Sequence, residues 1–351
     1  MTFDSVGEIV QRAISTKVFP CACIEIGRTK ETLWRGAFGH LTYDPQAAAV
    51  DHHTIFDLAS LTKVIATTTL AMRHIDAGRW TLTDPINQYV NGWRTSDREA
   101  VTIADLLAHS SGLQAHSPLF QEQGDRDAFK EKISRLPLEY TPRTMSVYSD
   151  LGFILLGFLV EDLAKESLDH QLRNMTESCG IDDLRYLPPD SWKTRTAPTG
   201  ENSLRGRRLV GEVHDDNGWA LGGVAGHTGL FGSTPAVGRF ARIIMSDLRG
   251  SEILVSSTTL QAFTRRTDIP NSSRALGWDT MLPTSSCGHS FSKSAIGHTG
   301  FTGTSLWIDP ELDLYIVCLT NRVHDPIDNN AMQIFRPALH DTALRASGLI
   351  D

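Results

Sequence analysis

Segments with the pattern of β-strands lie near both ends of the chain, and helical patterns fill most of the stretch between them. Strand patterns cover residues 22–27 and 32–38 near the start, and 304–308 and 314–319 near the end. Strands from the two ends can share one sheet only if the ends come together, with the middle of the chain as an insertion. We therefore expect a mixed α/β fold, of the α+β kind, with a sheet lobe and an inserted, mainly helical lobe.

Apolar residues recur at helical spacing in several stretches, and prolines separate those in the middle of the chain. The predicted helices cover residues 6–14, 60–77, 103–108, 127–136, 151–165 and 329–346. We place the sheet lobe at residues 1–59 and 216–351 and the helical lobe at residues 60–215. A catalytic cleft is expected between the two lobes.

Composition excludes several classes of protein. The 351 residues are 40% hydrophobic and 21% charged, which fits a globular chain with a conventional core. The net charge of −8 makes nucleic acid an unsuitable partner. The most apolar stretch, residues 151–160, is far shorter than the roughly 20 residues that span a bilayer. We therefore expect neither a nucleic-acid partner nor a membrane span, and the sequence does not fix the oligomeric state.

The start of the chain has no cationic segment followed by an apolar one. We expect a cytoplasmic protein if Met1 is the native start, and a periplasmic or extracellular one if a signal peptide has been removed. The five cysteines show no paired spacing for zinc or redox chemistry. Cys21 and Cys23 are spaced to share one face of a strand, so we interpret them as core residues.

The first candidate for chemistry is Ser60-Leu61-Thr62-Lys63. Residues i and i+3 share one face of a helix, so Lys63 would lie within reach of the Ser60 hydroxyl. Burial would depress the pKa of such a lysine and let it accept the serine proton. The alternative is a serine that caps a helix beside an exposed lysine.

The second candidate is Tyr148-Ser149-Asp150, directly before the apolar helix. A tyrosine acts as a general base when neighbouring cations lower its pKa, and Lys63 would be the natural cation. The alternative is a packed tyrosine with Asp150 as the N-cap of the helix.

The third candidate is His298-Thr299-Gly300, whose small residues on an edge strand would let a substrate backbone approach. The alternative is a turn between strands. A second copy, His227-Thr228-Gly229, leads into a helical pattern, and we interpret it as a structural turn. The run 214–217 (His-Asp-Asp-Asn) lacks the spacing of metal ligands and is interpreted as a loop. We expect no metal and no organic cofactor.

These three motifs, in this order, resemble the serine β-lactamase and penicillin-binding protein superfamily. The resemblance is to the class C branch, whose relatives include DD-peptidases, D-aminopeptidases and family VIII carboxylesterases. It covers nearly the whole chain and is supported by residues 56–63, by 82–85 and by 275–278. It implies a β-lactamase/transpeptidase-like fold, with an antiparallel sheet flanked by helices and an inserted helical lobe.

The resemblance also implies roles for individual residues. Ser60 would be the nucleophile, and Lys63 and Tyr148 would activate it. The backbone amides of Ser60 and Phe301 would form the oxyanion hole. Asp150 and the segment His298, Thr299 and Gly300 would bind the substrate.

Two residues depart from the pattern of the family. Asp150 stands where class C enzymes usually have asparagine, and its charge would raise the pKa of Lys63 if the two are close. His298 stands where they usually have lysine, and a histidine is only partly charged near neutrality. Both departures weaken the case for an efficient β-lactamase.

We therefore expect a serine hydrolase that cleaves an amide or ester bond through an acyl-serine, of the peptidase, amidase or carboxylesterase type. Its partner would be a small molecule or peptide, namely an ester, an amide, a muropeptide or a β-lactam. The alternatives are a true class C β-lactamase, a penicillin-binding sensor without turnover, and a scaffold that has lost the chemistry.

Overall fold

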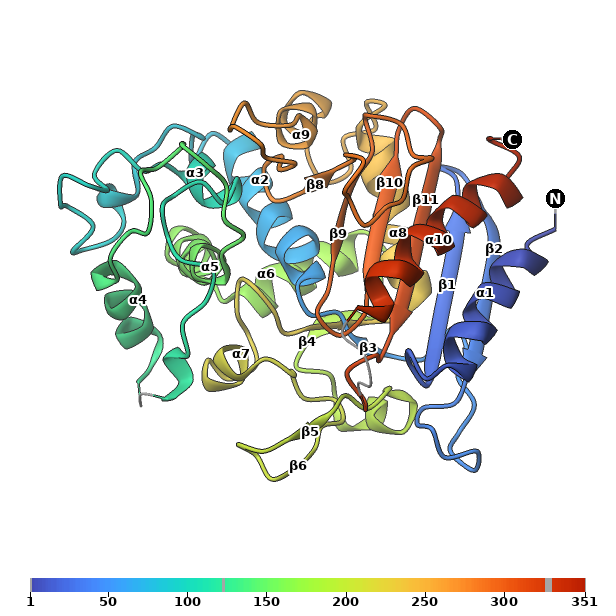
Figure 1. Ribbon diagram of the computed structural model, residues 1–351. Helices are drawn as coiled ribbons and strands as arrows, with labels where there is room; N and C mark the ends of the chain where they lie inside the picture. The colour runs from blue at the N-terminus through green and yellow to red at the C-terminus, as the bar shows by residue number, and fades with distance from the viewer. Residues whose placement is uncertain (1, 122–123, 326–329, 351) are drawn as a thin grey trace.

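The two ends of the chain build one antiparallel sheet, as the strand patterns predict. The computed structural model describes residues 2–121, 124–325 and 330–350. The six strands run in the order β2-β1-β11-β10-β9-β8 (Figure 1). Their bounds are β1 (Cys21–Gly27), β2 (Thr32–Gly39), β8 (Asp279–Thr280), β9 (Ile296–Thr299), β10 (Ser305–Asp309) and β11 (Leu314–Thr320).

Helices cover both faces of this sheet. Helices α1 (Asp4–Ser15) and α10 (Ala331–Ala346) pack on one face, and α8 (Thr234–Asp247) packs on the other (Figure 1). Side chains of β1 alternate between the two faces, and Cys21 and Cys23 are both buried on the α8 side, as their spacing predicts. Every residue of β1 is therefore buried.

Most of the remaining helices lie together beside the sheet (Figure 1). They are the π-helical segment Lys63–Thr68 with its continuation α2 (Thr69–Asp76), α3 (Ile103–Leu107), α4 (Arg126–Arg135), α5 (Asp150–Ala164), α6 (Leu168–Ser178), α7 (Asp216–Ala220) and α9 (Ser257–Thr264). Short 3₁₀ turns occur at Ile86–Gln88, Leu119–Gln121 and Asp190–Arg195. Residues 151–160 of α5 are all buried, which accounts for their apolar sequence. Within the described residues, no helix is long and apolar enough to cross a membrane.

Two small sheets complete the fold. Strand β7 (Leu230–Gly232) pairs with β3 (Phe56–Asp57) on one side and β4 (Leu184–Tyr186) on the other. A hairpin joins β5 (Glu201–Asn202) to β6 (Arg207–Arg208). Strand β3 ends three residues before Ser60, so its pairing with β7 fixes the chain at the point where the nucleophile follows.

The helices predicted from periodicity are confirmed, with shifts of a few residues at their ends. The predicted helix 329–346 begins at Ala331, and Asn329 lies outside the described residues. Helices α6, α7 and α9 were not predicted. In α6 the apolar residues are few and separated by charged ones. The boundaries of the two lobes stay a prediction.

A buried charged group joins α8 to the sheet. The Glu25 side chain on β1 is fully buried and binds four partners: the Arg35 Nε at 2.6 Å, the Arg242 Nη1 at 3.1 Å, the Tyr315 hydroxyl at 2.6 Å and the Thr32 hydroxyl at 3.5 Å. A β-carbon added to Gly238 of α8 would lie 1.9 Å from the Glu25 Oε1. Helix α8 can therefore approach the carboxylate only because residue 238 lacks a side chain.

We expect Gly238→Ala to lower the free energy of unfolding by about 3 kcal/mol, because the new methyl group must displace Glu25 from its partners. The matched control is Gly7→Ala in α1, where the added β-carbon meets Phe38 at an ordinary 3.5 Å. That change should raise the free energy of unfolding by about 0.5–1 kcal/mol through helix propensity. Chemical denaturation measures both, and equal effects would contradict the close approach.

Candidate active site

A cleft of about 650 Å³ brings the three predicted motifs together. Its walls include Ser60 from the first motif, Tyr148 and Asp150 from the second, and the segment His298, Thr299 and Gly300 from the third. These residues are far apart in the sequence, and the fold alone makes them neighbours. The candidate site predicted from the sequence is thus one place in the structure.

The side chain of Lys63 is fully buried beside Ser60. Its Nζ lies 3.1 Å from the Ser60 Oγ, 2.7 Å from the Asp150 Oδ1 and 3.0 Å from the backbone oxygen of His227. The alternative of an exposed lysine beside a capping serine is therefore wrong. The spacing argument for Lys63 is confirmed, since the two side chains are in hydrogen-bonding distance.

The protonation of Lys63 differs from the sequence-based expectation. Burial lowers the pKa of Lys63. The interactions of Lys63 with Asp150 and Tyr148 raise this pKa and outweigh burial, so the pKa of Lys63 is raised. The predicted depression of this pKa is wrong, whereas the predicted influence of Asp150 is right. An ammonium has three protons, and Lys63 has three acceptors around it. We conclude that Lys63 rests as a cation.

Tyr148 lies between cations and imidazole rings. The Lys63 Nζ is 4.9 Å from the centroid of its ring, and the Arg274 guanidinium is 5.1 Å from it. The rings of His109 and His298 lie 4.7 Å and 5.7 Å away. Its hydroxyl is buried and makes no hydrogen bond with any described residue. The hydroxyl is thus available to a group that enters the cleft.

Ser149 is the N-cap of α5, because its side chain accepts a hydrogen bond from the backbone N–H of Gly152. The alternative that made Asp150 the N-cap is therefore wrong. Asp150 occupies the first turn of α5 and turns its carboxylate to Lys63. The cap holds the helix start in place and leaves Asp150 free to form this ion pair.

His298 is neutral. Burial lowers the pKa of its imidazole well below the ordinary value, and the cations Arg274 and Lys63 lower it further. Its Nδ1 lies 2.8 Å from the backbone oxygen of Thr299, a contact that requires a proton on Nδ1. The buried Nε2 then has a bare lone pair and no partner among the described residues. The expected partial charge on His298 is corrected to none.

Strand β9, which carries His298, is not the outermost strand of the sheet. The two-residue strand β8 covers it, but only at Ile296 and Gly297. The outer side of the His298–Thr299 end has no paired strand among the described residues. The edge-strand prediction therefore holds for this end alone, where the strand borders the cleft.

The two N–H groups of the predicted oxyanion hole are not used within the described part of the protein. The backbone N–H groups of Ser60 and Phe301 make no hydrogen bond to any described residue. Gly300 lies so near the nucleophile turn that an added β-carbon would be 2.6 Å from the Leu58 oxygen. Glycine at this position lets the third motif approach Ser60, so both N–H groups can serve one oxyanion.

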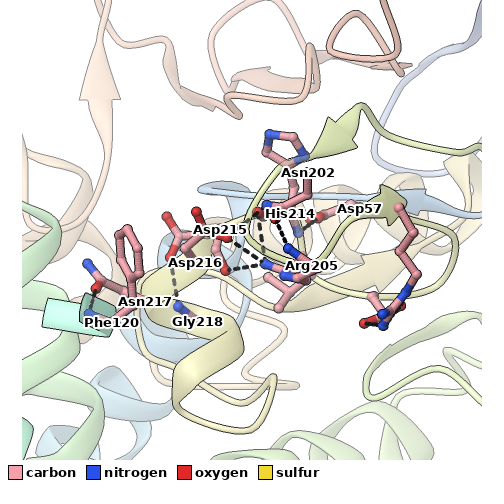
Figure 2. A network of polar contacts seen from close by, with 12 residues as sticks. Asp57, Phe120, Asn202, Arg205, His214, Asp215, Asp216, Asn217 and Gly218 are labelled. Carbon is pink, nitrogen blue, oxygen red and sulfur yellow. Dashed lines mark hydrogen bonds and ion pairs between the residues drawn. The ribbon is translucent and has the colours of Figure 1, made fainter. Parts of the chain in front are cut away.

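One wall of the cleft was missed by sequence reasoning (Figure 2). His227 and Asp215 both border the cleft, and the His227 Nε2 lies 3.0 Å from the Asp215 Oδ1. Asp215 also caps α7 through the N–H of Gly218. Burial raises the pKa of Asp215, but its contacts with His227 and Gly218 lower it more, so the carboxylate is ionised.

The prediction of a turn at His227 fits the backbone, which bends at residues 226–228, but the segment leads first into strand β7 and only then into α8. The prediction also omits the place of His227 in the cleft. Likewise, the run 214–217 is not a simple loop, because Asp215 begins helix α7. The repeated His-Thr-Gly was the one signal that could have pointed to this wall. Within the described part of the chain, no three His, Cys, Asp or Glu side chains are grouped for a metal ion. The expectation of a cofactor-free reaction stays a prediction.

Three arginines also border the cleft: Arg274, Arg322 and Arg336. None of them forms an ion pair with a carboxylate of the described residues. Arg336 donates to the backbone oxygens of Gly300 and Thr304, and Arg322 donates to that of Phe301. Burial lowers the pKa of Arg336 to about 10, which leaves it charged at neutral pH. The guanidinium of Arg274 makes no hydrogen bond within the described residues.

A serine beside a buried lysine and a tyrosine, under two free backbone N–H groups, is the site of a serine hydrolase. The sequence model of the Beta-lactamase family matches residues 7–338. The chain belongs to the beta-lactamase family.

Curated relatives and solved structures agree with this assignment. A protein of Escherichia coli K12 named "Putative D-alanyl-D-alanine carboxypeptidase" is 30% identical over 365 residues, which cover 91% of this chain and 82% of the relative. The fold is similar to that of EstCE1, a hydrolase with promiscuous acyltransferase activity, with a TM-score of 0.77, 17% identity and coverage of 96% and 98%. It is also similar to a class C β-lactamase from Rhodobacter sphaeroides, with a TM-score of 0.74, 16% identity and coverage of 96% and 99%.

We expect His298 to remain neutral from pH 8 to pH 6, with its proton on Nδ1, because burial and two nearby cations disfavour the imidazolium. Nitrogen-15 NMR of the histidine side chains measures this directly, and His298→Gln identifies the signal by its loss. A proton on Nε2, or a titration within this range, would contradict the geometry of the third motif.

Proposed function

We propose that the protein is a serine peptidase that cleaves the last amide bond of a peptide with a free terminal carboxylate. The observation that carries this proposal is Arg274, a guanidinium in the cleft without a protein partner among the described residues. It lies against Tyr148, on the side where a leaving group would receive its proton. A carboxylate on that leaving group would pair with Arg274. The name of the Escherichia coli relative supports a D-alanyl-D-alanine terminus as the substrate.

In the proposed reaction, Ser60 attacks the amide carbonyl, and the N–H groups of Ser60 and Phe301 bind the oxyanion. Lys63 begins as a cation, so we assign the serine proton to Tyr148, whose ring lies near both Lys63 and Arg274. Tyr148 then passes this proton to the departing amine, which leaves an acyl group on Ser60. Water then enters, gives a proton to Tyr148 and attacks the acyl carbonyl. The bond from this carbonyl to the Ser60 oxygen breaks, Tyr148 returns the proton to that oxygen, and the acyl product leaves as an acid.

The charges of the cleft disfavour efficient β-lactamase activity. The third motif carries a neutral His298 in place of a lysine, so it cannot attract the carboxylate of a β-lactam. Asp150 forms an ion pair with Lys63, and a carboxylate can accept hydrogen bonds from a substrate but cannot donate them. A substrate N–H suits that position better than a carbonyl. Only the second point separates the two substrates, because a peptide and a β-lactam both carry a carboxylate that Arg274 could bind. The second point favours the peptide.

We expect Ser60→Ala to lower kcat at least about 1,000-fold, because the nucleophile is lost. The panel is an N-acylated D-alanyl-D-alanine peptide, a short p-nitrophenyl ester and a chromogenic cephalosporin. We expect the highest kcat/KM for the peptide. Intact-mass measurement follows the acyl-enzyme on each substrate.

Each result of this panel separates one alternative. A lasting adduct on Ser60 without turnover would indicate a penicillin-binding sensor, and rapid turnover of the cephalosporin would indicate a β-lactamase. Preference for the ester would indicate a carboxylesterase. Full activity in Ser60→Ala would make the assignment of the nucleophile wrong.

The role of Arg274 predicts a second result. Arg274→Gln should lower kcat/KM about 10- to 100-fold for the peptide with a free carboxylate, because a charged hydrogen bond is lost. The same peptide with a terminal carboxamide should change less than about threefold. The control is Arg266→Gln, whose guanidinium binds the Thr280 hydroxyl and the Met281 oxygen and does not border the cleft. Equal losses on the acid and the amide would contradict this role.

A further inference from the structure

Asp57, at the end of β3, uses both carboxylate oxygens to bind the backbone of the cleft. Its Oδ1 accepts a hydrogen bond of 2.8 Å from the N–H of Ala59, and its Oδ2 accepts one of 2.7 Å from the N–H of His214. Figure 2 shows Asp57 beside His214 in this network. The Asp57 side chain is buried, so water cannot replace it as the acceptor for the N–H groups of Ala59 and His214.

The residue that precedes the nucleophile has an unfavourable backbone conformation. Ala59 has a φ of +47°, in the left-handed region that a β-carbon disfavours. Such a conformation persists only when surrounding contacts impose it. The hydrogen bond from the Ala59 N–H to Asp57 is such a contact, and it lies one residue before Ser60.

Asp57 and its neighbour also hold the loop of the third motif. The Thr302 hydroxyl donates to the backbone oxygen of Asp57 at 2.7 Å, and the Thr304 hydroxyl donates to that of Leu58 at 3.0 Å. Phe301, whose N–H belongs to the predicted oxyanion hole, lies directly before Thr302. Three parts of the cleft therefore meet at Asp57: the nucleophile turn, the His214 wall and the oxyanion loop.

We propose that Asp57 is a positioning residue for catalysis, which holds Ala59 in its left-handed conformation and thereby fixes the direction of the Ser60 hydroxyl and N–H. Asp57 touches neither the substrate nor the reacting atoms. The inference rests on the proposed function, because it requires Ser60 to be the nucleophile. It deepens that function by assigning a residue outside the three motifs.

The carboxylate form of Asp57 is the form that can accept both hydrogen bonds. Burial raises its pKa to about 6, although the N–H groups of His214 and Ala59 lower it. Two charged side chains also face it: Asp215 raises this pKa, and Arg205 lowers it. Burial also lowers the pKa of the neighbouring His214 imidazole. Below about pH 6, a protonated Asp57 would lose one acceptor, and activity should fall.

The contribution of Asp57 to stability should change with pH in the opposite direction from its contribution to activity. The folded-state pKa of Asp57 lies above its ordinary value of 3.8, so the folded protein binds the proton more tightly than the unfolded chain. The contribution of Asp57 to stability therefore increases as the pH falls from about 6 to about 4. A loss of activity in that range without a matching loss of fold would separate positioning from a structural role.

The main test is Asp57→Asn. The uncharged amide should fold, since it removes a buried charge and still accepts one hydrogen bond. We expect kcat to fall about 100-fold, similar to the loss of an oxyanion donor, while KM changes less than about threefold. The matched control is Asp247→Asn at the end of α8, a buried aspartate that accepts hydrogen bonds from the N–H groups of Ile253, Leu254 and Val255. It should change stability and leave kcat within about twofold.

A second comparison uses Ala59→Gly, because glycine adopts a positive φ without the β-carbon penalty. We expect Asp57→Asn with Ala59→Gly to regain at least about tenfold of the kcat lost in Asp57→Asn. If Asp57→Asn does not fold, the double variant is compared with Ala59→Gly alone, and the pH profile of the unaltered protein is measured beside its thermal unfolding.

The proposal is overturned if Asp57→Asn retains kcat as Asp247→Asn does, or if glycine at position 59 restores stability without restoring kcat. It is also overturned if the unaltered protein keeps full kcat from pH 7 to pH 4.5. The Ser60→Ala variant distinguishes these outcomes from failure of the proposed function. An inactive Ser60→Ala beside an active Asp57→Asn removes only the role of Asp57.

Discussion

A buried ammonium needs an acceptor for each of its three protons, and this requirement at Lys63 organises the cleft. The three acceptors come from the nucleophile turn, from the first turn of α5 and from the glycine-rich turn before β7. Each of these segments is fixed elsewhere by its own contacts: β3 pairs with β7, Ser149 caps α5, and the Thr67 hydroxyl binds the Gly226 oxygen. The lysine thus gathers parts of the chain that share no local sequence relation.

Charge is distributed unevenly around the reacting centre. Asp150 compensates Lys63, Asp215 pairs with His227, and His298 is neutral, so the inner cleft presents little free charge to a substrate. Arg274 differs from Arg322 and Arg336, because its guanidinium has neither a carboxylate partner nor a hydrogen bond in the described part of the chain. Selectivity in such a site depends on where a ligand places its own negative charge, and the location of Arg274 favours the leaving-group side. The fold of the beta-lactamase family is therefore combined with a third motif that carries a neutral histidine.

The architecture and the central residues of the site could be predicted from the sequence. Other residues of the site could not, for physical reasons. Periodicity reveals strands and helices because burial on one face repeats along the chain, and β1, β11 and α5 were found in this way. Ser60, Lys63, Tyr148, Asp150 and His298 stand in motifs with fixed local spacing. Asp215 with His227, and Arg274, were missed because contacts between loops leave no periodic pattern. The protonation of Lys63 was misjudged because it depends on a distance of 2.7 Å to a residue on another helix.

The pairing of the chain ends has a consequence for how the molecule forms. Strand β1 lies between β2 and β11, with Ile24 opposite Cys318 on one side and opposite Gly36 on the other. During synthesis the β1–β2 hairpin emerges early. The second neighbour of β1 is β11, which is made almost three hundred residues later. Until then one edge of an apolar strand is unpaired, a state prone to association with other chains. Closing such a long-range pairing is slow, so the last step of folding should be the arrival of the C-terminal strands.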